Sequence, residues 1–247
     1  MKLATLKNGS RDGKLVIVSR DLTRYTDASF LALSLQAALD DWRRISPHLA
    51  ALAESLELGS VPSSRFHEHD AHSPLPRAYQ RLGGGDAFAG PRDPIELPGK
   101  IRDAKVDAAV AVIVADVAMA ATEEAAKEAV ALIVLSTDTI LDGGQTGTSA
   151  LSPVAVTPDE LGDGWDGAVH LPLIAGARDV TSVWTSFPKV VAEAAASRAI
   201  GTGAIVRGAV ETLSVSLGDT LRVEMKDKAG HSIFGAIERQ VGRFEPA

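Results

Sequence analysis

The chain has 247 residues, of which 45% are hydrophobic and 23% are charged. These values are typical of a globular protein with one large domain, or with a small domain joined to a larger one, and they exclude a disordered chain. Acidic residues outnumber basic ones by 32 to 25, and the basic residues are scattered, which argues against nucleic acid as a partner. The absence of cysteine excludes a disulfide framework, thiolate metal ligands and a cysteine nucleophile.

The first residues, MKLATLKNGSRDGK, contain no apolar leader segment, so the default expectation is a cytoplasmic protein. The longest apolar run, at 108–121, is interrupted by Asp116. It is too short and too polar to cross a bilayer. We therefore expect no membrane segment.

The N-terminal part is predicted to contain two strands and two helices. MKLATLK and KLVIVS form the strands, because the intervening NGSRDG holds residues that reverse the chain. Leu35, Leu39 and Trp42 recur at helical spacing, and a second helix is expected after Ser46, its N-cap, with its end at Gly59. The Pro- and Gly-rich segment 61–100 is interpreted as a linker and loop region between two units.

The remainder alternates strands with short helices. Residues 106–117 and 132–141 are apolar enough for strands that are buried on both faces. Short helices are expected after Thr122, after Thr157 with capping-box spacing to Glu160, and over SFPKVVAEAAASR, which the glycines of IGTG would end. Residues 220–241 alternate around an Asp-Lys-Ala-Gly turn and predict a hairpin. The expected fold class is α+β.

A cluster of histidines lies in a polar loop. His67, His69 and His72 accompany Glu68 and Asp70 in RFHEHDAH. In an extended segment, alternate residues share a face, so these side chains could bind one ion. The preferred interpretation is a loop of exposed or hydrogen-bonded histidines. Whether the three histidines bind an ion stays open at this point.

Gly83, Gly84 and Gly85 form a glycine run that no Gly-Lys-Ser/Thr follows. This run is interpreted as a flexible turn and not as a phosphate-binding loop. No Gly-x-Ser-x-Gly motif is present, so a hydrolase triad has no support.

Four aspartates lie in or beside the strands that are expected to be buried: Asp103, Asp107, Asp116 and Asp138. A buried carboxylate is costly unless it is paired or binds a cation. They therefore indicate an ion site or a hydrogen-bonded site. The alternative is that each lies at a strand end or pairs with a nearby cation such as Lys105, and this alternative is preferred.

Several of these motifs together resemble the fumarylacetoacetate hydrolase family, in its bacterial subgroup with a small N-terminal domain. The matching stretches are MKLATLKNGSRDGKLVIVSRDLTR, LQAALDDW, RFHEHD, SPLPRAYQ, GPRDPI, LSPVAVTPDELG, SFP and LRVEMKDKAGHSIFGAIE. The resemblance implies a small α/β domain at 1–70, followed at 71–247 by the β-roll domain of the family with shortened active-site loops. It also implies a homodimer that uses Mg²⁺ or Mn²⁺ to hydrolyse, decarboxylate or isomerise oxo acids.

The resemblance also assigns site positions, and several of them differ from the family pattern. The Glu-x-Glu metal pair falls on Asp107 and Ala109, so one ligand is shortened and the other is lost. The aspartate ligand falls on Asp138 and is preserved. The substrate-contacting lysine is replaced by Thr146.

Further positions depart from the family as well. The His-Glu pair of the family lid has no counterpart after SPLPRAYQ, the stretch that contains Arg77. A Gly-Ser-Gly-Thr turn is replaced at 207–210, beginning with Arg207. The candidate catalytic residues are therefore Asp107, Asp138 and Arg207, the candidate substrate contacts are Thr146 and Arg77, and no metal or other cofactor is assigned.

Three hypotheses follow. A hard cation needs about six oxygen ligands, so Asp107 and Asp138 alone favour a metal-free site. The first hypothesis is a modified small-molecule pocket that isomerises, cyclises or cleaves an oxo compound without metal. The second is a pseudoenzyme that serves as a binding or assembly partner. The third is a metal-dependent hydrolase or decarboxylase whose ligands are misaligned.

Overall fold

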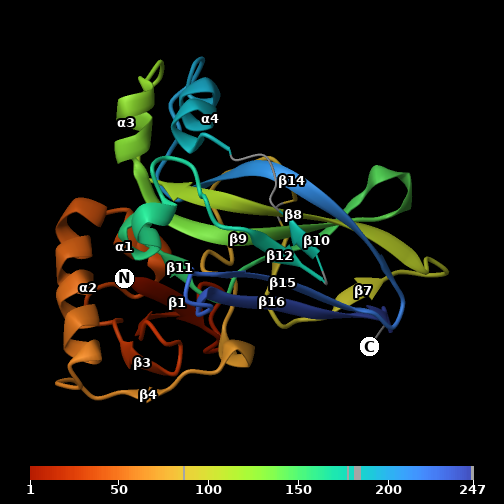
Figure 1. Ribbon diagram of the computed structural model, residues 1–247, viewed down its shortest axis with the longest axis horizontal. Coiled ribbons are helices and arrows are strands. Elements are labelled where there is room, and N and C mark those ends of the chain that lie inside the picture. The colour runs from red at the N-terminus through yellow and green to blue at the C-terminus, as the bar shows by residue number, and fades with distance from the viewer. Residues whose placement is uncertain (86, 177, 181–184, 246–247) are drawn as a thin grey trace.

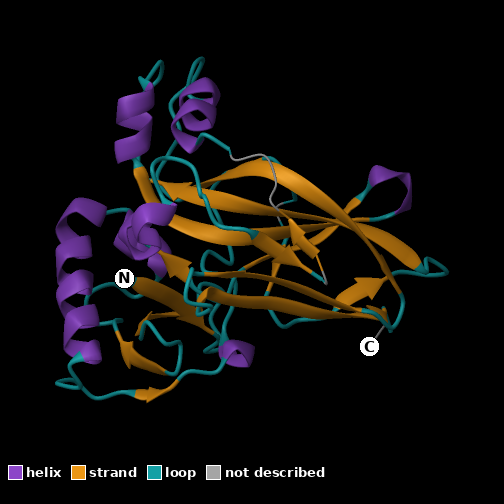
Figure 2. Ribbon diagram, in the orientation of Figure 1, coloured by secondary structure: helices purple, strands orange, loops and turns teal. Residues whose placement is uncertain are grey.

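The computed structural model describes residues 1–85, 87–176, 178–180 and 185–245. Strands are its main regular elements, as Figure 2 shows, and they belong to two sheets. The predicted α+β class is confirmed, since the helices lie outside the sheets and do not alternate with parallel strands. None of the helices in the described part of the chain is long and apolar enough to cross a membrane.

The larger sheet joins strands from both ends of the chain. Over the described residues it has eleven strands, nine of them in the order β4-β3-β2-β1-β11-β9-β8-β14-β5. Of the other two, β10 pairs with β9, and β6 pairs with β10. Their bounds are β1 Lys2–Leu6, β2 Lys14–Val18, β3 Arg24–Asp27, β4 Ser64–Arg65, β5 Arg81–Leu82, β6 Phe88–Ala89, β8 Asp103–Val114, β9 Val130–Ile140, β10 Thr146–Leu151, β11 Ala155–Val156 and β14 Ala204–Ser216. The expected domain boundary at residue 70 falls between strands of this one sheet and stays a prediction.

The smaller sheet lies against one face of the larger one. Within the described residues its order is β13-β12-β15-β16-β7. The bounds are β7 Ile95–Leu97, β12 Leu173–Ala175, β13 Arg178–Val180, β15 Thr220–Lys226 and β16 Ser232–Arg243. Strands β15 and β16 form the predicted hairpin, whose turn is closed by two backbone N–H groups that donate to Asp227 Oδ1. In Figure 1 these two strands run below the long strands β8, β9 and β14.

Short helices complete the fold. They are α1 Leu35–Leu39, α2 Trp42–Glu57, α3 Glu123–Glu128 and α4 Phe187–Ala194, with 3₁₀ turns at Glu68–Asp70, Asp142–Gly144 and Pro158–Gly164. The α3 start is as predicted, since Thr122 Oγ1 accepts a hydrogen bond from Ala125 N.

Two of the predicted helix ends are wrong. Helix α2 begins at Trp42 and contains Pro47, so Ser46 is not its N-cap; the apolar face through Ile45 and Leu49 starts before the proline, and its packing outweighs the lost backbone hydrogen bond. The start predicted after Thr157 is confirmed, since a 3₁₀ turn begins at Pro158, although Thr157 makes no side-chain cap with it. Helix α4 ends at Ala194, well before the glycines.

The long strands bury both faces because successive side chains point to opposite sides. On β9, Leu132 and Val134 join the core cluster that includes α1 and α2, whereas Ile133 and Leu135 join the cluster that includes β15 and β16. The larger sheet is therefore packed between helices and the smaller sheet. Along the helix-side face of β9 the series continues through Ser136 to Asp138, where the side chains become polar.

Candidate functional site

The register of the large sheet places the two candidate aspartates side by side. Asp107 on β8 pairs directly with Asp138 on β9, and Thr212 on β14 pairs with Asp107 on the other side. Directly opposed residues share a face, so their side chains meet. Asp138 also pairs with Ser149 on β10. The result is a row of polar side chains across four strands.

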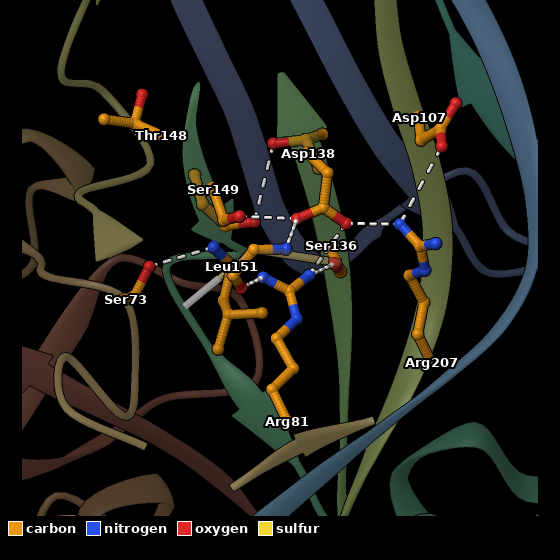
Figure 3. A network of polar contacts seen from close by, with 12 residues as sticks. Ser73, Arg81, Asp107, Ser136, Asp138, Thr148, Ser149, Leu151 and Arg207 are labelled. Atoms are coloured by element: carbon orange, nitrogen blue, oxygen red, sulfur yellow. Dashed lines mark hydrogen bonds and ion pairs between the residues drawn. The ribbon is translucent and has the colours of Figure 1, made fainter. Parts of the chain in front are cut away.

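Asp138 is the centre of this row, and donors from four other segments surround it. Figure 3 shows its carboxylate between Arg81 and Arg207. Oδ2 accepts from Arg81 Nη2 at 2.9 Å and from Arg207 Nη1 at 2.5 Å. Oδ1 accepts from Ser149 Oγ at 2.5 Å and from Gly85 N at 3.2 Å. Each oxygen thus accepts two hydrogen bonds, which satisfies a buried carboxylate.

The site has a covered part and a reachable part. The side chains of Asp138 and Arg81 are 0% and 3% exposed, whereas those of Arg207 and Asp107 are 16% and 19% exposed. Asp107 Oδ2 lies 3.9 Å from Arg207 Nη1, and its Oδ1 accepts from Thr212 Oγ1 at 2.6 Å. A small molecule can therefore reach Asp107 and Arg207 while Asp138 and Arg81 remain covered.

The glycine run closes the site above Asp138. Gly84 has φ +85°, and a Cβ built on it would lie 2.5 Å from Asp138 Oδ2. The carbonyl of Gly85 accepts from Arg81 Nη1 at 2.5 Å. A side chain at Gly84 would displace the carboxylate, so only glycine fits there. The run thus packs closely against the carboxylate, and its interpretation as a flexible turn stays a prediction.

A β-bulge lies beside the site on β14. The pairing of β14 with β8 shifts between Arg207 and Val210. Ala209 N, within the bulge, donates to Thr185 Oγ1 at 2.7 Å. Bulges re-aim side chains next to functional sites. Here the bulge follows Arg207, whose guanidinium extends along the sheet to Asp138.

The two predicted substrate contacts lie in different places. Thr146 is exposed at the start of β10, where its Cγ2 would be 2.5 Å from a Cβ at Gly85. Arg77 is exposed and pairs with Asp12, with Nη2 and Oδ2 2.5 Å apart. This pairing raises the pKa of Arg77 and lowers that of Asp12. Thr146 is thus brought to the edge of the site, whereas the contacts of Arg77 are with Asp12.

The histidine segment forms a separate region. His67 and His69 are exposed, and Glu68 between them forms an ion pair with Arg92. His72 is half-buried, and burial lowers its pKa, as does the nearby Lys7. Among the described residues, no group of three or more His, Asp or Glu side chains is arranged to hold a metal ion. Binding of an ion by these histidines stays untested.

Arg81, Ser149 and Gly85 are site residues that the sequence analysis did not identify. Serine and glycine are common residue types, and no motif in the sequence marks Ser149 or Gly85 as a site residue. Arg81 carries a weak signal, since it lies two residues before the glycine run, but nothing in the sequence shows that it will meet a residue 57 positions later. Its guanidinium also stacks on Phe88, with 4.9 Å from Cζ to the ring centroid.

The groups around Asp138 do not fit Mg²⁺ or Mn²⁺, the ions that the family resemblance implies. These ions take oxygen ligands and need carboxylate charge. Both Asp138 oxygens accept from nitrogen or hydroxyl donors, and Gly84 packs against the carboxylate. The neighbouring position on the same face of β8 is Ala109, which has no ligand atom.

Comparison with known proteins agrees with the predicted resemblance. Residues 1–77 match the family model described as Fumarylacetoacetase N-terminal domain 2. No curated protein sequence matches the chain.

Several solved structures share the fold over the full length. Maleylpyruvate hydrolase from Sphingobium sp. SYK-6, in complex with manganese(II) ion and pyruvate, is 17% identical with a TM-score of 0.73, and 99% of this chain and 100% of that chain are covered. The 5-carboxymethyl-2-hydroxymuconate delta-isomerase from Mycobacterium smegmatis has 14% identity and a TM-score of 0.62, with the same coverage of 99% and 100%. Fumarylacetoacetate hydrolase from Exiguobacterium antarcticum also has 14% identity and a TM-score of 0.62, again with 99% and 100% covered. The chain therefore begins with a segment that matches a fumarylacetoacetase N-terminal domain, and its whole length has the fold of fumarylacetoacetate hydrolase and related structures.

Proposed function

We propose that this protein is a metal-independent isomerase that moves a proton at the carbon next to the carbonyl of a small oxo acid. One observation carries the proposal: the reachable carboxylate of Asp107 lies beside the reachable guanidinium of Arg207, above a covered Asp138 whose charge is already balanced. A base next to a fixed cation suits the formation and collapse of an enolate.

The chemical step uses both groups. Asp107 takes a proton from the carbon next to the carbonyl, and the electron pair of that C–H bond forms the enolate. Arg207 donates to the oxygen on which the negative charge develops. Asp107 then returns the proton, either to the same carbon or to another carbon of a conjugated enolate, and the second outcome isomerises the substrate. No atom or electron is gained or lost over the cycle.

The structural neighbours support the choice of substrate class and reaction. One neighbour is an isomerase, and another is a hydrolase whose structure contains pyruvate and manganese. For the present chain, the oxo acid is a proposal drawn from that likeness, and the metal-free step follows from the groups that surround Asp138. A homodimer, as the family resemblance implies, remains part of the proposal.

The test is hydrogen–deuterium exchange of oxo acids, followed by proton NMR. Chelator-treated protein in D₂O with EDTA is mixed with pyruvate, 2-oxobutanoate or acetopyruvate. We expect exchange next to the carbonyl of at least one of them to exceed the buffer rate. Asp107→Asn should lower that exchange by a factor of about 100 or more, as expected for loss of a general base.

Asp103→Asn is the matched control. Asp103 lies on the same strand and accepts from a β14 hydroxyl, Ser216 Oγ, at 2.7 Å, as Asp107 does from Thr212. This variant should exchange at the wild-type rate. If no oxo acid exchanges faster than in buffer, or if Asp107→Asn matches the wild type, the proposal is wrong.

A second candidate function is a non-catalytic binding or assembly protein. It is favoured by the complete hydrogen bonding of Asp138, which forms a self-contained structural ion network. Absence of exchange under every condition supports this candidate. Exchange that begins only after Mn²⁺ is added supports a metal-dependent enzyme instead.

A further inference from the structure

Asp107 and Asp138 form a close pair of like charges. They are directly opposed on β8 and β9, and Asp138 is fully buried. Like charges directly opposite each other in a sheet are destabilising, and burial increases the cost. A cation near both carboxylates therefore offsets their repulsion.

Arg207 is the cation that lies near both. Its Nη1 is 2.5 Å from Asp138 Oδ2 and 3.9 Å from Asp107 Oδ2. Arg81 contributes a second positive charge, but its ion pair is with Asp138. The two guanidinium groups balance the two carboxylates, and one nitrogen atom, Arg207 Nη1, lies between them.

We propose that Arg207 is a covalently attached replacement for a divalent cation, and that removing its side chain opens a cation site between Asp107 and Asp138. This inference rests on the metal-free site of the proposed function and adds the reason why that site needs no metal. An attached guanidinium neutralises the carboxylates without a binding equilibrium, so neither dilution nor a chelator removes it. It supplies one unit of charge and no open coordination position.

The groups that remain without Arg207 are suited to a hard cation. The oxygen atoms left are those of the Asp107 and Asp138 carboxylates and of the Thr212 and Ser149 hydroxyls, which lie in one row across the sheet. Arg81 Nη2 and Gly85 N still donate to Asp138, so the position that opens is the one that Arg207 Nη1 occupied, between Asp138 Oδ2 and Asp107 Oδ2. Arg207 is partly exposed, so water can enter the space that its side chain leaves. Oxygen ligands with water at the remaining positions are the usual environment of Mg²⁺ and Mn²⁺.

The experiment titrates Mn²⁺ into chelator-treated protein and measures free Mn²⁺ by electron paramagnetic resonance. Three proteins are compared: the wild type, Arg207→Ala and Arg207→Lys. We expect the wild type and Arg207→Lys to leave Mn²⁺ free, since both retain a positive charge at this position. Arg207→Ala should bind Mn²⁺ at least about tenfold more tightly than either.

Two results overturn the inference. One is stoichiometric binding of Mn²⁺ by the wild type, which shows that the guanidinium does not replace the ion. The other is a folded Arg207→Ala protein that binds no more Mn²⁺ than the wild type. Because the titration contains no substrate, its outcome is independent of the exchange assay that tests the proposed function.

Loss of folding in Arg207→Ala is handled by two further measurements. Folding of this variant on addition of Mn²⁺, but not of K⁺, followed by circular dichroism, supports the inference. Arg207→Gln keeps most of the side-chain volume without the charge. If Arg207→Ala does not fold with any cation and Arg207→Gln folds but binds no Mn²⁺, the inference is wrong.

Discussion

Asp138 is a buried carboxylate whose donors come from β5, the glycine run, β10 and β14. These segments are far apart in the sequence. The high cost of an unpaired charge in the protein interior favours the arrangement that brings their donors to Asp138. The two guanidinium groups depend on Asp138 in the same way. A change at one member therefore leaves buried charge at another.

Asp138→Asn is expected to lower the free energy of unfolding by about 3–5 kcal/mol, because it removes one partner of a buried ion pair and leaves the other charged. Urea denaturation followed by circular dichroism measures the change. Asp103→Asn, which lies at the exposed end of β8, should cost less than about 1 kcal/mol. Equal costs for the two variants would show that the Asp138 network does not stabilise the fold.

The glycine run is the element that separates Asp138 from solvent. Gly83 and Gly84 both have φ near +85°, so the backbone itself covers the carboxylate and Arg207 without a side chain between them. This close approach is the reason why three consecutive glycines occur here. Because the backbone lies so close to these side chains, we expect that adding a single methyl group to the run destabilises the protein.

Gly84→Ala should be more destabilising than Gly9→Ala. Both residues have φ +85°, so both alanines suffer the same backbone strain, but a Cβ at Gly9 has nothing within 4 Å whereas one at Gly84 meets the Asp138 carboxylate. We expect an additional cost of about 1–3 kcal/mol at Gly84, the usual range for overpacking. Urea denaturation of both variants measures the difference. An additional cost near zero would mean that the carboxylate and the loop can move apart freely.

For the molecule as a whole, Arg239 connects the two sheets. It lies on β16 of the smaller sheet and is fully buried. Its Nη2 donates to Thr148 Oγ1 on β10 of the larger sheet at 2.8 Å, and its Nε donates to the carbonyl of Asp93 at 2.7 Å. Burial lowers its pKa to about 10, although the nearby Asp93 raises it. The residue beside Thr148 is Ser149, so this connection also supports the candidate site.

Arg239→Met is expected to lower the free energy of unfolding by about 2 kcal/mol, because hydrogen bonds from a charged group are lost and the acceptors stay buried. Hydrogen exchange followed by mass spectrometry should show faster exchange in β16 and β10 than in β8. Arg222→Met, on the neighbouring strand with a side chain that is 44% exposed, is the control and should leave exchange in β10 unchanged. If hydrogen exchange is faster in all strands of both variants, Arg239 does not specifically connect β16 to β10.

The sequence predicted the long strands β8 and β9, the terminal hairpin and the start of α3, but not β14, the strand that carries Arg207. These features depend on alternation, turn residues and capping side chains that lie close together in the chain. The prediction from sequence was wrong where packing outweighed a local signal, as at the start of α2, which contains Pro47. The family resemblance placed Asp107, Asp138 and Arg207 in one site before any geometry was known, and the structure brings these three together. It did not identify Arg81 or the role of the glycine run.

By itself, then, the sequence determined the α+β class, the strand pattern and the likeness to the fumarylacetoacetate hydrolase fold, because strand alternation and motif spacing are local properties of the chain. The tertiary structure alone decided which charges meet. Asp138 lies 57 residues from Arg81 and 69 residues from Arg207 in the chain, and only the sheet register and the β14 bulge bring the three side chains together. Charge balance in a buried site depends on such distant contacts, because electrostatic energy is set by distance in space and by burial, whatever the separation in sequence.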